Sequence, residues 1–145
     1  MSIDNFIKIG ILVKQDSSKD EIADLLKIVE RDLEDSAQTE ISDDWQFGIA
    51  YNAALKLANI LVRASGYRVK GQGHHMNTIA MISLVLGTHK KDDSDYLDTC
   101  RRKRNVVEYD CVGGATAEDV RELREFVVEF QKEVLTWLAK KNYDK

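Results

Sequence analysis

The chain has 145 residues, of which 43% are hydrophobic and 32% charged, a composition typical of one globular domain with a buried core. Its net charge is −4, which excludes a uniformly basic nucleic-acid-binding surface but leaves room for a local basic patch. No apolar run approaches the ~20 residues of a membrane span, and the N-terminus lacks the features of a signal peptide. We therefore expect a single cytoplasmic domain over residues 1–145, with no membrane association.

The N-terminal part of the chain is expected to be helical. The apolar segment 6–13 is predicted to form a short helix, with a strand as the alternative because Ile and Val are frequent there. Ser18 and Glu21 have the spacing of a capping box, which marks a helix start. Apolar residues follow at intervals of three and four, as in an amphipathic helix: Ile22, Leu25, Leu26, Val29 and Leu33.

Two further helices are delimited by serine and glycine. Ser42 is expected to cap a helix that ends at Gly66. Its apolar residues form a wide stripe, with several side chains small enough for another helix to approach closely: Trp45, Ile49, Ala50, Ala53, Ala54, Leu57, Ile60, Leu61 and Ala64. The next helix is expected between Gly73 and Gly87.

The C-terminal half is also expected to be helical. The acidic cluster 92–95 is interpreted as the start of a helix reaching about Tyr109, rather than as a metal site, because carboxylates are favourable there. Thr116 begins a long last helix, whose apolar seam suits either the bundle interior or a second copy of the chain. The short loops, with no convincing strand pair, predict an all-α antiparallel bundle of about five helices, with its core over about 18–138.

The segment 101–110 is the most distinctive part of the sequence. On a helix, Arg101, Asn105 and Tyr109 form one polar stripe, because residues four apart share a face. Arg104 lies nearer the apolar side, where an arginine needs an acidic, phosphate or carbonyl partner. Two hypotheses follow: a charged helix surface with internal pairs such as Arg104 with Glu108, or a basic patch that binds phosphate through the arginine donor fork.

The adjacent histidines His74 and His75 are candidates for acid–base chemistry if their helix begins beside the basic segment. The alternative is that one packs or caps at the helix start and the other faces solvent. Cys100 and Cys111 match no common zinc spacing and are expected to be small buried thiols. We expect no metal site and no cofactor.

Two tyrosines and an arginine form a further candidate cluster. Tyr51, and Tyr67 with Arg68 at a helix end, are suited to stacking on a base or binding a phosphate. The alternative is packing, with Tyr67 covering the end of the bundle. The sequence contains no P-loop, which excludes nucleotide hydrolysis of that type.

The order and lengths of the expected helices, from about Ser18 to Trp137, resemble those of HEPN domains (higher eukaryotes and prokaryotes nucleotide-binding). Four strings add to the resemblance: Ala50-Tyr51-Asn52-Ala53-Ala54, Gly66-Tyr67-Arg68, Gly73-His74-His75 and Arg104-Asn105. Many HEPN proteins have an arginine, a polar residue and, four to six residues after the arginine, a histidine. In those proteins the motifs of two subunits meet in a cleft that cleaves RNA without a metal ion. Others bind RNA, nucleotides or a partner protein, and members commonly occur in toxin–antitoxin and antiviral systems.

The resemblance assigns roles to particular residues. Arg104 and Asn105 match the arginine and polar positions, and Tyr109 stands where the histidine would be. An unperturbed tyrosine, with a pKa around 10, is only about 0.1% ionised at pH 7. The proton transfer therefore needs a strongly lowered pKa at Tyr109, or His75 in its place.

Two functions from different classes follow from the resemblance. The first is a homodimer that acts on or binds RNA, as a metal-independent endoribonuclease of a toxin–antitoxin or defence system. In it, Arg104, Asn105 and Tyr109 are catalytic, and the substrate is bound by a second set of residues: Arg101, Tyr51, Tyr67, Arg68, His74 and His75. The alternative is a non-catalytic module for dimerisation and docking of a nucleotide or a protein, such as an antitoxin or a nucleotidyltransferase.

Overall fold

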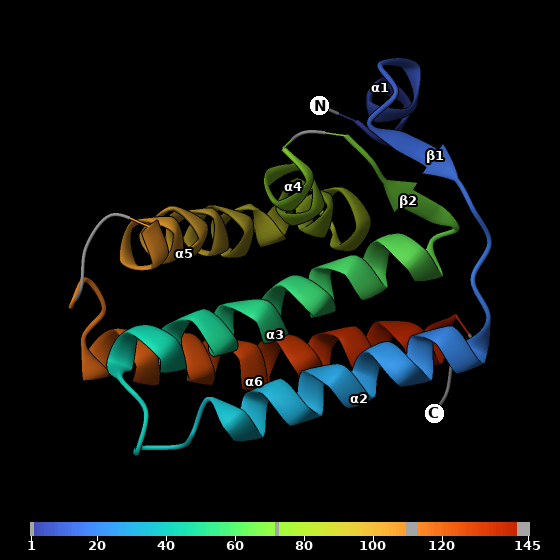
Figure 1. Ribbon diagram of the computed structural model, residues 1–145. Helices are drawn as coiled ribbons and strands as arrows, with labels where there is room; N and C mark the ends of the chain where they lie inside the picture. Colours follow the sequence, from blue (N-terminus) through green and yellow to red (C-terminus); the bar gives the residue numbers. More distant parts are fainter. Residues whose placement is uncertain (1, 72, 110–112, 142–145) are drawn as a thin grey trace.

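The structure, a computed structural model, describes residues 2–71, 73–109 and 113–141, without the side chains of Glu108 and Tyr109. In chain order its elements are α1 (Ile3–Lys8), β1 (Leu12–Lys14), α2 (Lys19–Asp35), α3 (Asp43–Ala64), β2 (Tyr67–Val69), α4 (His74–Leu86), the 3-10 helix η1 (Thr88–Lys90), α5 (Lys91–Tyr109) and α6 (Ala117–Lys140) (Figure 1). The predicted all-α class is confirmed. Within the described residues there are six α-helices, in agreement with the expected bundle of about five.

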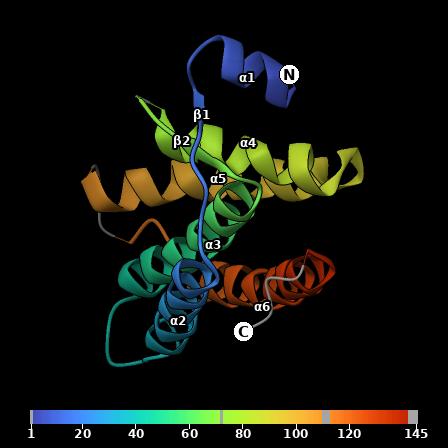
Figure 2. The same cartoon turned by 90° about the vertical axis from the view of Figure 1, so that its right-hand side faces the viewer.

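Helix α3 is the centre of the bundle. Figures 1 and 2 show α2 and α6 on one side of it and α4 and α5 on the other. Most of its residues are buried, including Phe47, Leu57 and Leu61, and its alanines Ala50 and Ala53 are fully enclosed. A helix that is apolar around most of its circumference is stable only when neighbours cover it on all sides. α3 therefore packs against both helix pairs, α2 with α6 and α4 with α5, and separates them.

A two-stranded antiparallel sheet joins β1 to β2, with Leu12 opposite Val69. The expectation that no strands pair is therefore wrong. Of the segment 6–13, only the beginning is helical, in α1, and the alternative of a strand is correct for its end, in β1. Gly10, at φ +80°, ends the first helix. Leu12 and Val69 are then buried in a small apolar cluster that includes Phe6 and Met81. Strands of three residues are too short for a period of two to appear in the sequence.

Side-chain caps start the helices as expected. Hydroxyl oxygens accept hydrogen bonds from backbone N–H groups three residues later at three helix starts: Ser18, Ser42 and Thr116. Gly66 follows α3 and Gly73 precedes α4, both with the positive φ that glycine adopts without strain. Trp45 departs from the predicted apolar stripe, because its side chain in the first turn of α3 is 63% exposed.

Arg63 fastens the end of α3 to the segment before α2. Its side chain is buried and donates to the backbone carbonyls of Gln15, Asp16 and Tyr67. Its Nε lies 2.7 Å from a carboxylate oxygen of Glu21. The carboxylate that was expected to complete the capping box at Ser18 is therefore engaged by an arginine from another helix.

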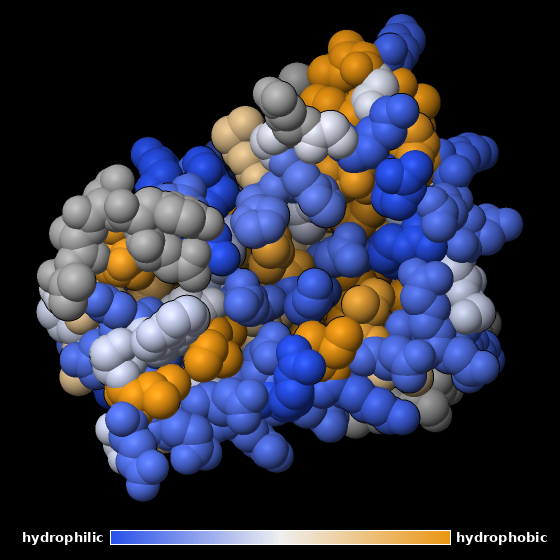
Figure 3. Space-filling view, viewed as in Figure 1, coloured by the Kyte–Doolittle hydropathy of each residue, from blue (hydrophilic) through white to orange (hydrophobic). Residues whose placement is uncertain are grey.

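The surface is largely polar over α2, whereas apolar side chains gather around α1 (Figure 3). Ile9 and Met76 are 60% and 49% exposed. A cavity of about 470 Å³ runs between Phe6 and the facing surfaces of α4 and α5. Of the helices in residues 2–71, 73–109 and 113–141, none combines the length and the apolar character needed to cross a membrane.

Candidate functional site

The histidines of α4 and the basic segment of α5 lie side by side. The two helices are joined by only residues 87–90, pack against each other and run in opposite directions (Figure 2). His75 lies about three helical turns before this connection along the chain, and Arg101 about three turns after it, so the two are at the same level of the helix pair. The fold therefore brings the histidine pair close to the basic segment. The hypothesis that one of these histidines takes part in acid–base chemistry requires this.

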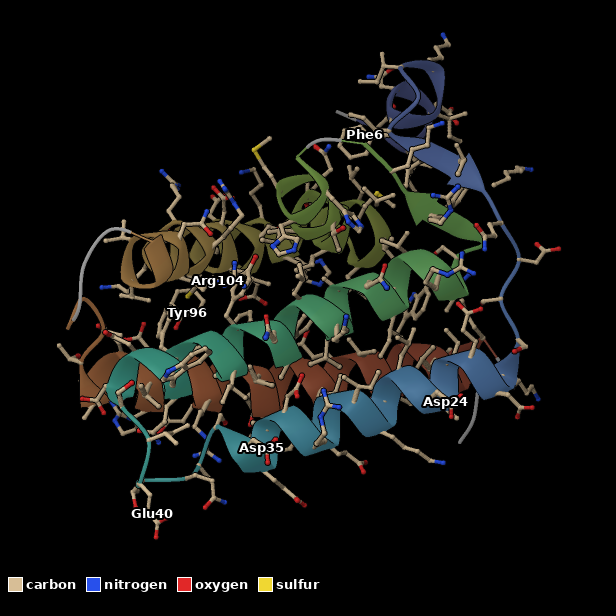
Figure 4. All side chains as sticks on the ribbon, in the orientation of Figure 1. Phe6, Asp24, Asp35, Glu40, Tyr96 and Arg104 are labelled. Atoms are coloured by element: carbon tan, nitrogen blue, oxygen red, sulfur yellow. The ribbon has the colours of Figure 1, made fainter. Side chains whose placement is uncertain are left out.

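A polar cluster connects α3, α4 and α5. Tyr51 of α3 is fully buried, and its hydroxyl oxygen lies 3.4 Å from Nδ1 of His75. The guanidinium carbon of Arg104 lies 5.7 Å from the centroid of the Tyr51 ring, within the range of a cation–π contact. Nη1 of Arg104 is also 3.5 Å from Oδ1 of Asn105. Figure 4 shows Arg104 between α5 and α3, and the 5.7 Å distance puts its charge against the ring of the buried Tyr51.

The surroundings hold both partners of the Tyr51–His75 contact in their neutral forms. Burial lowers the pKa of His75, and the positive charges of Arg104, His74, Arg101 and Lys56 lower it further. Burial raises the pKa of Tyr51, against the opposing effect of Arg104. At pH 7 the imidazole is therefore neutral and the phenol keeps its proton. In the tautomer with hydrogen on Nδ1, Tyr51 accepts that hydrogen and Nε2 is left as a base.

A cavity of about 340 Å³ opens beside this cluster. It is lined by Gly71, Gly73, His74, His75, Met76, Arg101 and Asn105. Nε of Arg101 lies 2.8 Å from Oδ1 of Asp98, which fixes the arginine and offsets part of its charge. The lining combines a guanidinium, an amide and two imidazoles, the donors that proteins use for phosphate groups.

A second, smaller cavity of about 100 Å³ adjoins the first, since His74 and His75 line both. Its other lining residues are Leu55, Lys56, Asn59 and Thr78. These residues were not predicted from the sequence, although a signal existed. Leu55 and Asn59 follow Tyr51 at intervals of four, and Thr78 follows His74 at the same interval, so each pair shares a helix face.

The predicted site residues are therefore only partly brought together. Arg101, Asn105, His74 and His75 line one cavity, and Tyr51 and Arg104 lie behind it. The predicted grouping of Tyr51 with Tyr67 and Arg68 is not observed. Tyr67 and Arg68 belong to β2, which lies beyond the end of α3, and that end is about 20 Å along the helix from Tyr51.

Other interactions account for the residues left outside the cluster. Arg68 donates from Nε to Oε1 of Gln15 at 2.7 Å, and Tyr67 packs against the small apolar cluster near α1. Cys100 is a buried thiol whose pKa is raised to about 11 by burial, as expected of a packing residue. Cys111 and the side chain of Tyr109 lie outside the described residues. The predicted role of Tyr109 stays a prediction.

Comparison with known proteins adds no family assignment. No family model matches the chain, and no curated protein or solved structure does. The HEPN resemblance rests on the sequence features alone. In the part of the chain that the structure describes, no three His, Cys, Asp or Glu side chains are grouped so as to hold a metal ion.

Proposed function

We propose that the chain is a HEPN-like ribonuclease that binds an RNA phosphodiester in the cavity between α4 and α5. The observation that supports this best is the position of His75. A neutral imidazole, in contact with a buried tyrosine, lies at the wall of a cavity that Arg101 and Asn105 also line. Packing alone does not require this combination.

The proposed reaction needs one base and one group that stabilises negative charge. Nε2 of His75 takes the proton of the ribose 2′-hydroxyl, and the 2′-oxygen forms a bond to phosphorus. The bond from phosphorus to the 5′-oxygen breaks, and the leaving oxygen takes a proton from water. Arg101 and Asn105 hydrogen-bond the phosphate oxygens, whose charge grows in the transition state. The products are a cyclic phosphate and a free 5′-hydroxyl.

The geometry changes the role proposed for Arg104. This residue matches the family's motif arginine, but it is half-buried against Tyr51, and Arg101 is the arginine that lines the cavity. We therefore assign phosphate binding to Arg101. Arg104 is a positioning residue, which packs on Tyr51 and helps to keep His75 neutral through its charge.

The homodimer belongs to the same proposal. In HEPN ribonucleases the motifs of two subunits form one cleft, so a second copy of the chain would bring another Arg101 and His75 to the substrate. Light scattering of the purified protein measures this directly. A monomer that cleaves RNA would remove the dimer from the proposal without affecting the roles of the individual residues. A place in a toxin–antitoxin system follows from the resemblance only.

The test is cleavage of end-labelled structured RNA in EDTA by the wild type and by His75→Gln, Arg101→Gln and Tyr109→Phe. Arg102→Gln is the matched control, because the Arg102 side chain is on the same helix and 67% exposed. We expect His75→Gln and Arg101→Gln each to lower the rate at least 100-fold, and Arg102→Gln to lower it less than threefold. The Tyr109→Phe rate decides whether tyrosine contributes in place of the motif histidine.

The alternative is the non-catalytic docking module, and the inward position of Arg104 favours it, because a motif arginine turned against a tyrosine does not contact substrate. RNA binding without cutting, weakened by Arg101→Gln, would support this alternative. If the protein neither cuts nor binds RNA, the RNA function is refuted, and the next partner to test is a protein.

A further inference from the structure

We infer that the small cavity lined by Lys56, Asn59 and Thr78 binds a second phosphate of the same RNA strand, next to the phosphate that is cleaved. This inference rests on the proposed function and extends it, because it assigns a binding site to residues with no part in the reaction. It also predicts the minimal ligand, which has two adjacent phosphates rather than one.

Thr78 supplies the first observation. Its side chain is 2% exposed, and its Oγ1 has no hydrogen-bond partner among the described residues. A buried hydroxyl without a partner is costly, and threonine in a helix usually donates to the carbonyl four residues earlier. The Thr78 side chain instead lines the small cavity. A ligand with an acceptor oxygen would satisfy it.

The charge of the lining indicates which ligand fits. Lys56 brings a positive charge, and Asn59 and Thr78 bring neutral donors. No carboxylate lines either cavity within the described part of the chain. The cavity volume of about 100 Å³ is a few times the ~30 Å³ share of a water molecule, enough for a group the size of phosphate.

The arrangement of the two cavities indicates a continuous strand. His74 and His75 form a shared wall, and their ring centroids are 6.2 Å apart. Successive nucleotides advance by about 3.4 Å along a duplex axis and by more in an extended strand. Because His74 and His75 line both cavities, the two cavities adjoin, as sites for two successive phosphates of one strand must.

The binding test compares two non-cleavable dinucleotides, with a 2′-O-methyl group at the scissile position, that differ only in a 3′-terminal phosphate. Calorimetry of the wild type is expected to show roughly tenfold tighter binding of the phosphorylated form, the gain from about one charge-assisted contact. Lys56→Gln should abolish this gain and Thr78→Val should reduce it, while neither changes the affinity for the unphosphorylated form. Lys27→Gln, an exposed lysine of α2, makes the same charge change and should keep the gain.

A second probe, inorganic phosphate, separates this inference from the proposed function. In ¹H–¹⁵N spectra, phosphate should shift the Thr78 backbone amide and the Asn59 side-chain amide of the wild type but not of Lys56→Gln. No shift at these groups, or an equal gain from the terminal phosphate in all variants, overturns the inference even if Arg101 and His75 process RNA as proposed. Shifts in a protein that binds neither dinucleotide refute the proposed function, and with it the assignment of the cavity to RNA. Melting temperatures no lower than that of the wild type show that the variants fold.

Discussion

Replacement of Tyr51 by phenylalanine removes one oxygen atom from the centre of the proposed site. The ring stays, and with it the packing of α3 and the contact with the Arg104 guanidinium 5.7 Å from the ring centroid. The hydroxyl makes one neutral contact with His75 at 3.4 Å, which is long for a hydrogen bond. Such a bond contributes at the low end of about 0.5–1.5 kcal/mol. We expect Tyr51→Phe to lower the free energy of unfolding by less than about 1 kcal/mol.

The effect of Tyr51→Phe on activity should be much larger than its effect on stability. Without the hydroxyl, the His75 ring loses its polar contact at Nδ1, which helps to hold Nε2 toward the cavity in the proposed mechanism, and the rate of RNA cleavage should fall at least tenfold. Urea unfolding and cleavage assays on one preparation measure both quantities. A stability loss above about 2 kcal/mol with a proportional loss of folded protein would show that the hydroxyl is structural. Full activity would refute the orientation of His75 by Tyr51.

Three other predictions follow from the same geometry. Arg63→Met should lower the free energy of unfolding in urea by about 2–3 kcal/mol, because it leaves buried acceptor oxygens without a hydrogen-bond donor. Arg68→Met removes an exposed pair and should lower it by less than about 1 kcal/mol. Thr78→Val should keep or raise stability, by up to about 1 kcal/mol, because the hydroxyl it removes has no partner among the described residues; a clear loss would mean that the hydroxyl is bonded. The folded-state pKa of His75 is depressed, so the unfolded chain binds more protons and stability falls as the pH drops below the unfolded pKa of about 6.5. His75→Gln should therefore reduce the difference in melting temperature between pH 7 and pH 5, and an unchanged difference would contradict the shift.

The helical elements were predictable because their signals are local. Serine and threonine caps and the positive-φ glycines mark helix ends by chemistry that acts within a few residues. The strand pair was not predictable in this way. Leu12 and Val69 are far apart in the sequence, and each strand has only three residues. Their pairing depends on tertiary burial against Phe6 and Met81.

The candidate site was predictable along each helix but not between helices. The interval of four correctly places Arg101 and Asn105 on one face, since both line the cavity. The same rule does not show which other helix that face meets. Tyr51 was grouped with Tyr67 because the two have the same side chain, whereas the structure places Tyr51 against Arg104 of α5. Lys56 and Thr78 were missed for the same reason.

The buried tyrosine is the best reason to regard this region as a site rather than a scaffold. Phenylalanine would fill the same volume in α3 without a hydroxyl to desolvate, and an apolar residue at position 104 would pack on it without a charge to bring out of water. A bundle selected for packing alone would favour those residues at its centre. This one instead holds a phenol, a guanidinium and an imidazole in contact, at the wall of a cavity that opens to solvent. The energetic cost of that arrangement is explained if the three groups control the protonation and orientation of His75.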